Sequence, residues 1–277
     1  MIDMISNQLA ILGHPHRISV FRMLMRRYPD TVPAGEVADE LGIKPSTLSN
    51  YLNALQRSGL VTQERSGTSL RYSVNMKNVQ HMLGFLLNDC CRGRPDICMP
   101  SEQGKGAMTD RKFNVLFICV GNSARSIFAE TLLRDISGDR FNVYSAGTRS
   151  FSELNPIAVQ VLEDKGHDTS ALRSKSISEF SGPGAPDLDF VFTVCNKAAN
   201  EECPAWDGQP ISGHWGMNDP VTATGTEAEK SLAFQNAYGA LKRRIEAFTS
   251  LPVESLDRIA LQSAVDDIGR TPVEETQ

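Results

Sequence analysis

The sequence predicts two domains: a mainly α-helical winged helix-turn-helix domain, followed by an α/β domain with three layers and a central parallel sheet. The 277 residues are enough for about two domains of roughly 100–200 residues each. Helical spacing of apolar residues dominates before residue 99, whereas apolar runs alternate with helical patterns after residue 112. Residues 99–112 are polar, contain glycine and have no periodicity, which predicts a linker.

Composition and charge limit the classes of protein. The chain does not start with a basic segment followed by an apolar run, and no stretch approaches the roughly 18 apolar residues of a spanning helix. We therefore expect a cytoplasmic protein without a membrane partner. Six cysteines are too few for a disulfide scaffold, which favours reduced thiols that bind metal or catalyse. The net charge is -5, but residues 1–100 hold 11 Lys and Arg against 8 Asp and Glu, a balance compatible with nucleic-acid binding.

The first predicted domain, residues 1–98, begins and ends with helical patterns. Apolar residues recur at helical spacing over 9–24 and again over 79–90. Two shorter helical patterns and two extended runs lie between them. Helix spacing alone would also fit an ordinary helical hairpin. The order helix, helix, hairpin, helix favours a winged helix-turn-helix.

The centre of this domain has the pattern of a DNA-reading unit. A helix over 34–41 stops at Gly42, and Ser46 is available as a cap where the next helix opens. Extended runs on both sides of Ser66-Gly67 predict a β wing. Polar side chains at the start of the second helix can face base edges, and basic side chains on the wing can face phosphates. The predicted DNA-binding residues are Lys44, Ser46, Thr47, Ser49, Asn50, Arg65 and Arg71.

Three cysteines gather at the end of the first domain, at Cys90, Cys91 and Cys98. A disulfide staple, a metal site and reactive thiols are the alternatives. Adjacent cysteines form strained disulfides, and structural zinc sites usually need four ligands. Three thiolates make a soft, sulfur-only donor set that satisfies trivalent arsenic or antimony. The tract is therefore predicted to bind such an ion.

Residues 5–98 resemble the ArsR/SmtB family of metal-responsive repressors. The resemblance lies in segments 12–24, 41–61 and 67–74, although His14 stands where the family usually has an acidic residue. It implies a homodimer, paired through its first and last helices, that holds operator DNA until a soft or transition metal binds. A minority of the family resembles this chain in its cysteine pattern, which implies arsenite as the inducer ligand.

The second predicted domain, residues 113–250, repeats strand and helix. Apolar runs lie at 114–120, 141–147 and 188–194, and helical patterns at 125–136, 156–166 and 231–248. This alternation predicts a parallel sheet with helices on its faces. Residues 251–277 are predicted to form one amphipathic helix and a frayed tail.

The segment around Cys119 carries the clearest chemical signal. An apolar strand over 115–118 runs into Cys119, and a helix begins at Arg125. A tight turn between them would point backbone N–H groups at a tetrahedral oxyanion, which Arg125 can bind in a fork. Cys119 is the predicted nucleophile, and Ser126 offers a hydroxyl that can support it. The predicted oxyanion-binding residues are Gly121, Asn122, Ser123 and Ala124.

Residues 112–250 resemble the low-molecular-weight protein tyrosine phosphatase fold, through the Cys119 segment, "YSAG" and "NDPV". The resemblance implies that Asp219 is the general acid. Two positions depart from the phosphatase pattern: Val221 replaces an aromatic residue, and Ala124 replaces a frequent cysteine. A second thiol pair, Cys195 and Cys203, closely resembles that of arsenate reductases built on this fold.

That resemblance implies a thiol relay. Cys119 attacks arsenate, Arg125 and the loop amides hold its oxygens, and Asp219 protonates the departing oxygen. Cys195 then attacks Cys119 as arsenite leaves, and Cys203 resolves the disulfide. The resulting Cys195–Cys203 disulfide is presented to an external thiol donor, of the thioredoxin or the glutathione/glutaredoxin type.

The combined hypothesis is an arsenite-responsive repressor fused to a thiol-dependent arsenate reductase, with no tightly bound cofactor. Its partners would be operator DNA, arsenate, arsenite and the thiol donor. One alternative is a tyrosine phosphatase fused to a DNA-binding regulator, with the second thiol pair incidental. Another is a transcription factor whose second domain senses an oxyanion without catalysis.

Overall fold

The computed structural model describes residues 2–90, 111–149, 153–182, 184–201, 206 and 209–271. The chain separates into two compact units, Met1–Gly106 and Ala107–Gln277, and each unit has its own hydrophobic core. Within the described ranges, no helix is long and apolar enough to cross a membrane.

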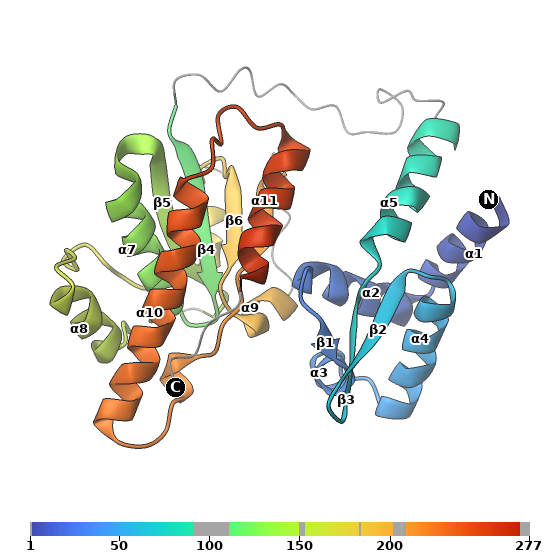
Figure 1. The fold of residues 1–277 in the computed structure, drawn as a ribbon, viewed down its shortest axis with the longest axis horizontal. Coiled ribbons are helices and arrows are strands. Elements are labelled where there is room, and N and C mark those ends of the chain that lie inside the picture. Colours follow the sequence, from blue (N-terminus) through green and yellow to red (C-terminus); the bar gives the residue numbers. More distant parts are fainter. Residues whose placement is uncertain are drawn as a thin grey trace. The chain divides into compact units, whose positions relative to one another are not determined.

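The first unit is a helical domain with a small antiparallel sheet in the order β1-β3-β2 (Figure 1). Leu48, Leu52 and Leu55 recur on one side of the fourth helix and are buried in the core, as expected from helical spacing. The elements are α1 (Ile2–Leu12), α2 (Pro15–Arg27), β1 (Val32–Pro33), α3 (Ala34–Leu41), α4 (Pro45–Arg57), β2 (Val61–Ser66), β3 (Ser69–Val74), α5 (Met76–Phe85) and a π-helical turn (Leu86–Cys90).

The predicted helix-turn-helix and wing are present, with two local differences. Gly42 ends α3 with a φ of 62°, a left-handed conformation that glycine adopts at low cost. The predicted cap at Ser46 is wrong, because Lys44 is the N-cap residue and Pro45 takes the first helical position without a side-chain cap. The apolar pattern over 9–24 also belongs to two helices, because α1 ends at Leu12 and α2 begins at Pro15.

The second unit has a parallel four-stranded sheet in the order β5-β4-β6-β7, flanked by helices (Figure 1). Helix α7 packs on β4 and β5 and against α10. The carboxyl ends of parallel strands share one edge of the sheet, so chain segments that follow different strands meet there. The elements are β4 (Phe113–Cys119), α7 (Arg125–Ser137), β5 (Phe141–Gly147), α8 (Pro156–Asp164), β6 (Phe190–Thr193), α9 (Asn196–Asn200), β7 (Ile211–His214), α10 (Glu227–Thr249) and α11 (Arg258–Arg270).

The boundaries of the second unit are wider than the sequence predicts. Arg111, placed in the linker, donates from both terminal guanidinium nitrogens to the carboxylate of Asp189, at 2.6 and 2.9 Å. Helix α11, placed outside the domain, packs on β7, and the indole of Trp215 donates to the carbonyl of Val265 at 3.3 Å. Helix α11 therefore covers the edge strand of the sheet, which would otherwise expose unpaired backbone groups.

Candidate active site and DNA-binding surface

Cys119 ends β4, and its buried thiol is held by the turn that follows. The backbone N–H of Asn122 donates to Cys119 Sγ at 3.1 Å. Asn122 has a φ of 47°, a left-handed conformation that asparagine tolerates better than most residues. Gly147, at the end of β5, leaves room for the turn, since a Cβ there would lie 2.8 Å from the carbonyl of Val120. The turn therefore curls back around the sulfur.

The side chain of Asn122 orients a buried hydrogen-bond network toward this thiol. Its Oδ1 accepts from the backbone N–H of Lys175 at 2.7 Å. Its Nδ2 therefore supplies two hydrogens, one to Ser126 Oγ at 2.9 Å and one to Ser145 Oγ at 2.8 Å. Because Ser126 accepts from the amide, its own hydrogen is available to Cys119 Sγ, which lies 2.9 Å away. This is the supporting contact expected of Ser126.

Glu130 and Lys175 complete the network, and sequence reasoning missed both, together with Ser145. The hydroxyl of Ser145 donates to Glu130, and Lys175 Nζ lies 2.9 Å from Glu130 Oε2. The two charged side chains are only 9% and 12% exposed. The nearest signal was the "YSAG" segment, which contains Ser145.

Substituting Lys175→Met is expected to lower the free energy of unfolding by about 2 kcal/mol, because it leaves a mostly buried carboxylate without its cation. Chemical denaturation measures this loss. Lys112→Met is the matched control: Lys112 pairs with Asp139, but the two side chains are 46% and 98% exposed, so we expect no measurable change. Equal losses in the two variants would contradict a special role for the buried pair.

Arg125 and Asp219 face each other beside the nucleophile turn. Arg125 begins α7 and is buried, whereas Asp219 is 36% exposed at its side chain. Arg125 Nη2 donates to Asp219 Oδ2 at 2.5 Å, and its Nη1 donates to the carbonyl of Met217 at 3.3 Å. The predicted anion-binding cation and the predicted general acid are thus together, although 94 residues separate them in the chain.

Cys195 lies directly after β6 and is buried, with 1% of its surface exposed. Its Sγ accepts from the backbone N–H of Ala198 at 3.3 Å as the N-cap of α9. Burial raises the pKa of the Cys195 thiol, Arg125 lowers it, and Cys119 raises it. Ile118 of β4 pairs in register with Thr193 of β6, so Cys119 and Cys195 follow neighbouring parallel strands at the same edge of the sheet.

Three of the predicted cysteines, Cys91, Cys98 and Cys203, lie outside the described residues. Cys90 is a free and exposed thiol at the end of the π-helical turn after α5. The other predicted loop residues, Gly121, Ser123 and Ala124, form the turn between β4 and α7. The carbonyl of Ser123 accepts from the backbone N–H of Asn155 at 3.0 Å, which anchors the turn to the start of α8.

The predicted DNA-binding residues differ in how free their side chains are. Exposed residues of this set lie at the N-terminal end of α4 and on the wing, and they are Lys44, Ser46, Ser49, Asn50 and Arg65. Thr47 is half-buried. Arg71 is held within the domain, since it donates to the Thr31 side chain at 2.8 Å and to the Thr31 carbonyl at 2.6 Å. Arg71 therefore ties the wing to the segment before β1 instead of extending toward a ligand.

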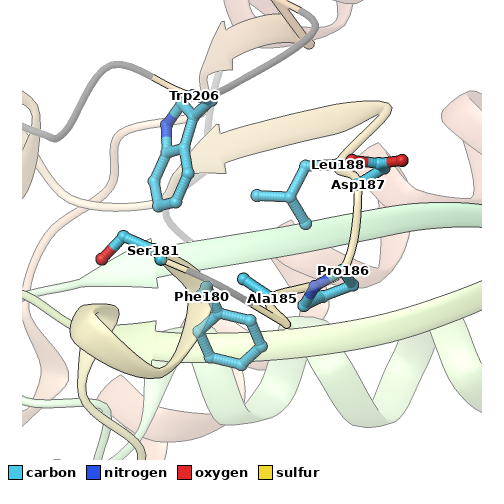
Figure 2. A pocket seen from close by; sticks show the side chains of 8 residues that line it. Phe180, Ser181, Ala185, Pro186, Asp187, Leu188 and Trp206 are labelled. Carbon is cyan, nitrogen blue, oxygen red and sulfur yellow. The ribbon is translucent and has the colours of Figure 1, made fainter.

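A separate pocket in the second unit has both apolar and polar residues in its lining (Figure 2). The lining residues are Phe180, Ser181, Gly182, Ala185, Pro186, Asp187, Leu188 and Trp206. None of the lining residues belongs to the predicted relay.

Comparison with known proteins gives matches in both units. The model of the family described as low molecular weight phosphotyrosine protein phosphatase matches residues 114–260, and a helix-turn-helix domain model matches residues 12–64. An arsenate reductase of Bacillus licheniformis is 38% identical over 141 residues, which cover 50% of this chain and 95% of the relative.

Two solved structures are also similar to parts of the chain. An arsenate reductase in the oxidized state has 28% identity and a TM-score of 0.41, and the match covers 48% of this chain and 93% of that one. An ArsR-like transcriptional regulator from Rhodococcus sp. RHA1 has 20% identity and a TM-score of 0.31, with 35% and 89% covered.

Proposed function

The chain belongs to the low molecular weight phosphotyrosine protein phosphatase family, and from this premise we propose that its second unit reduces arsenate to arsenite. The relative from Bacillus licheniformis is named arsenate reductase, and it aligns with this chain over 95% of its own length. The geometry of Cys119, Arg125, Asp219 and Cys195 supports the same activity.

The first step is attack by the Cys119 thiolate on arsenic. A sulfur–arsenic bond forms while one arsenate oxygen leaves as water, and Asp219 supplies a proton to that oxygen. Arg125 and the N–H groups of the turn balance the negative charge on the remaining oxygens. The contact between Arg125 and Asp219, at 2.5 Å, keeps the cation and the acid within reach of the same substrate.

The second step transfers two electrons to arsenic. Cys195 Sγ attacks Cys119 Sγ, so a disulfide forms, the sulfur–arsenic bond breaks, and its electron pair leaves with arsenic as arsenite. Cys203 then attacks Cys195, which releases Cys119 as a thiolate. An external dithiol reduces the Cys195–Cys203 disulfide and returns the protein to its starting state.

The observation that carries this proposal is the position of Cys195. It is buried and follows β6, the strand beside the one that ends at Cys119, and both Arg125 and Cys119 influence its pKa. Hydrolysis of a phosphate ester uses one nucleophilic cysteine and gains nothing from a second thiol there. Reduction of an oxyanion, in contrast, needs a second thiol to form the disulfide, and Cys195 can supply it.

The decisive experiment is arsenate reduction by the purified chain, with thioredoxin and glutaredoxin systems compared side by side. We expect thiol-dependent formation of arsenite with at least one of them. Efficient phosphotyrosine hydrolysis without thiol-dependent arsenate turnover would instead support the phosphatase alternative.

We further propose that the first unit is an ArsR-type repressor, acting as a homodimer in the cytoplasm, where thiols stay reduced. The helix-turn-helix match and the exposed polar start of α4 support operator binding. Arsenite, the product of the second unit, would be the inducer and bind Cys90, Cys91 and Cys98.

Replacing Cys90, Cys91 and Cys98 together with serine is expected to preserve operator binding and abolish its response to arsenite. Serine oxygens are hard donors and bind trivalent arsenic poorly compared with thiolates. Fluorescence anisotropy of labelled operator DNA during arsenite titration measures both properties. Cys119→Ser is the matched control and should respond to arsenite like the unmodified chain. Release of the triple variant by arsenite would refute the sensor site, and a response of the Cys119→Ser chain to arsenate would favour an oxyanion sensor.

A further inference from the structure

His214 is a buried side chain that the proposed relay does not use. It ends β7, is 2% exposed, and pairs in register with Thr193 of β6. Its Nδ1 lies 2.8 Å from Thr193 Oγ1, and its Nε2 lies 3.1 Å from Asn196 Oδ1. One imidazole thus links two strand ends to the first residue of α9.

The partners of His214 define its tautomer. An amide oxygen can only accept, so Nε2 carries the hydrogen that is donated to Asn196. In that tautomer Nδ1 is an acceptor, to which the hydroxyl of Thr193 can donate. Because each contact uses a different ring nitrogen, the imidazole bridges Thr193 and Asn196 and holds them at a set separation.

Helix α9 needs such an anchor because it is short. It has five residues, Asn196–Asn200, and an isolated helix of that length is unstable in water. The contact between His214 and Asn196 lies at the start of α9, where Cys195 is the N-cap residue.

The chain after β7 leaves room for this anchor. A Cβ at Gly216 would lie 2.3 Å from Asn196 Oδ1 and 2.5 Å from His214 Nε2. Only glycine therefore allows the backbone to lie this close to the hydrogen bond between His214 and Asn196. The same segment continues to Met217, whose carbonyl accepts from Arg125. The anchor of α9 and the support of the Arg125 side chain thus belong to one stretch of chain.

We propose that His214 is a positioning residue for the second thiol: through Asn196 it holds α9, and hence Cys195, where Cys195 can attack Cys119. This inference rests on the proposed relay and adds to it the group that sets the alignment of its second step. Alignment of two reacting sulfurs controls the rate of their exchange.

Asn196 is the residue to substitute, because it is exposed and its replacement leaves no cavity in the hydrophobic core. In the full chain, Asn196→Ala is expected to slow arsenite release in a single turnover, without external reductant, by about three- to tenfold, as for loss of one hydrogen bond. Asn196→Asp keeps the acceptor oxygen and should restore most of the rate, although its negative charge opposes thiolate formation at Cys195. Lys197→Ala, on the next exposed residue of α9, is the matched control and should behave like the unmodified chain.

Two further measurements separate this inference from the proposed function. Diamide oxidation, followed by mass mapping of the Cys119–Cys195 disulfide, reports the alignment of the thiols without arsenate and should slow in Asn196→Ala alone. Alkylation of Cys119 by iodoacetamide reports the nucleophile turn and should be equal in all variants. Unchanged cross-linking in Asn196→Ala, or an equal change in Cys119 alkylation, would overturn the positioning role. Absence of arsenite from the unmodified chain would overturn the proposed function, while the cross-linking result would still decide the role of His214.

Discussion

Cys119→Ser is expected to lower thiol-dependent arsenate reduction by at least about a thousandfold. A serine hydroxyl is a weaker nucleophile than a thiolate at neutral pH, and its oxygen cannot enter the disulfide that carries two electrons away from arsenic. The substitution replaces one sulfur atom by oxygen, and we expect the backbone of the turn to keep its geometry. Arsenite formation with the active reductant measures the effect.

Ser126→Ala is the comparison that makes this result specific. It keeps Cys119 but removes the hydroxyl that lies 2.9 Å from Sγ, so we expect a loss of about tenfold, the size of one hydrogen bond to a charged group. Circular dichroism of both variants should match the unmodified chain. Turnover by Cys119→Ser above about one per cent of the original rate would show that another residue is the nucleophile.

Cys195→Ala is expected to abolish repeated turnover while preserving the first attack. Without a second thiol beside Cys119, the sulfur–arsenic bond has no partner to break it, so the covalent adduct should accumulate to one equivalent. Mass spectrometry of the intact chain after rapid quenching detects the adduct, and arsenite should be absent. The same substitution at exposed Cys90, in the other unit, should leave turnover unchanged. Normal turnover by Cys195→Ala would make Cys195 incidental and strengthen the phosphatase alternative.

The second step should also speed up as pH rises. Burial, above all, raises the pKa of Cys195, and Cys119 acts in the same direction, against the opposing effect of Arg125. The reactive thiolate is therefore scarce at neutral pH and increases toward the raised pKa. Stability changes in the opposite sense: because the folded pKa lies above the unfolded one, the contribution of Cys195 is complete below the unfolded pKa and is lost as pH rises through the folded pKa. Single-turnover arsenite release and denaturation, each followed against pH, test the two signs.

Long, periodic elements and the local geometry around Cys119 were predictable from the sequence. The helices α4, α7 and α10 and the strands β4 and β5 have strong periodic or apolar patterns, and each is present. Strands β1 and β7 are not predictable in this way: β1 has only two residues, and β7 (ISGH) lacks the apolar run that predicts β6. Helix α11 was recognised as a helix but not as part of the second unit, since its periodicity does not reveal that it packs on β7.

The site divides in the same way. The sequence by itself determined the nucleophile turn, because Cys119, Ser126 and Arg125 lie within one strand–turn–helix segment whose geometry depends on neighbouring residues. Only the tertiary structure decided that Lys175 reaches Glu130 from 45 residues away, that Arg71 is held by Thr31, and that His214 anchors the helix of Cys195. Such contacts depend on how strands and helices align in three dimensions, and no short-range spacing records that alignment. The order of the residues therefore specifies which chemistry the chain carries, and the packing of the sheet specifies which side chains hold that chemistry in place.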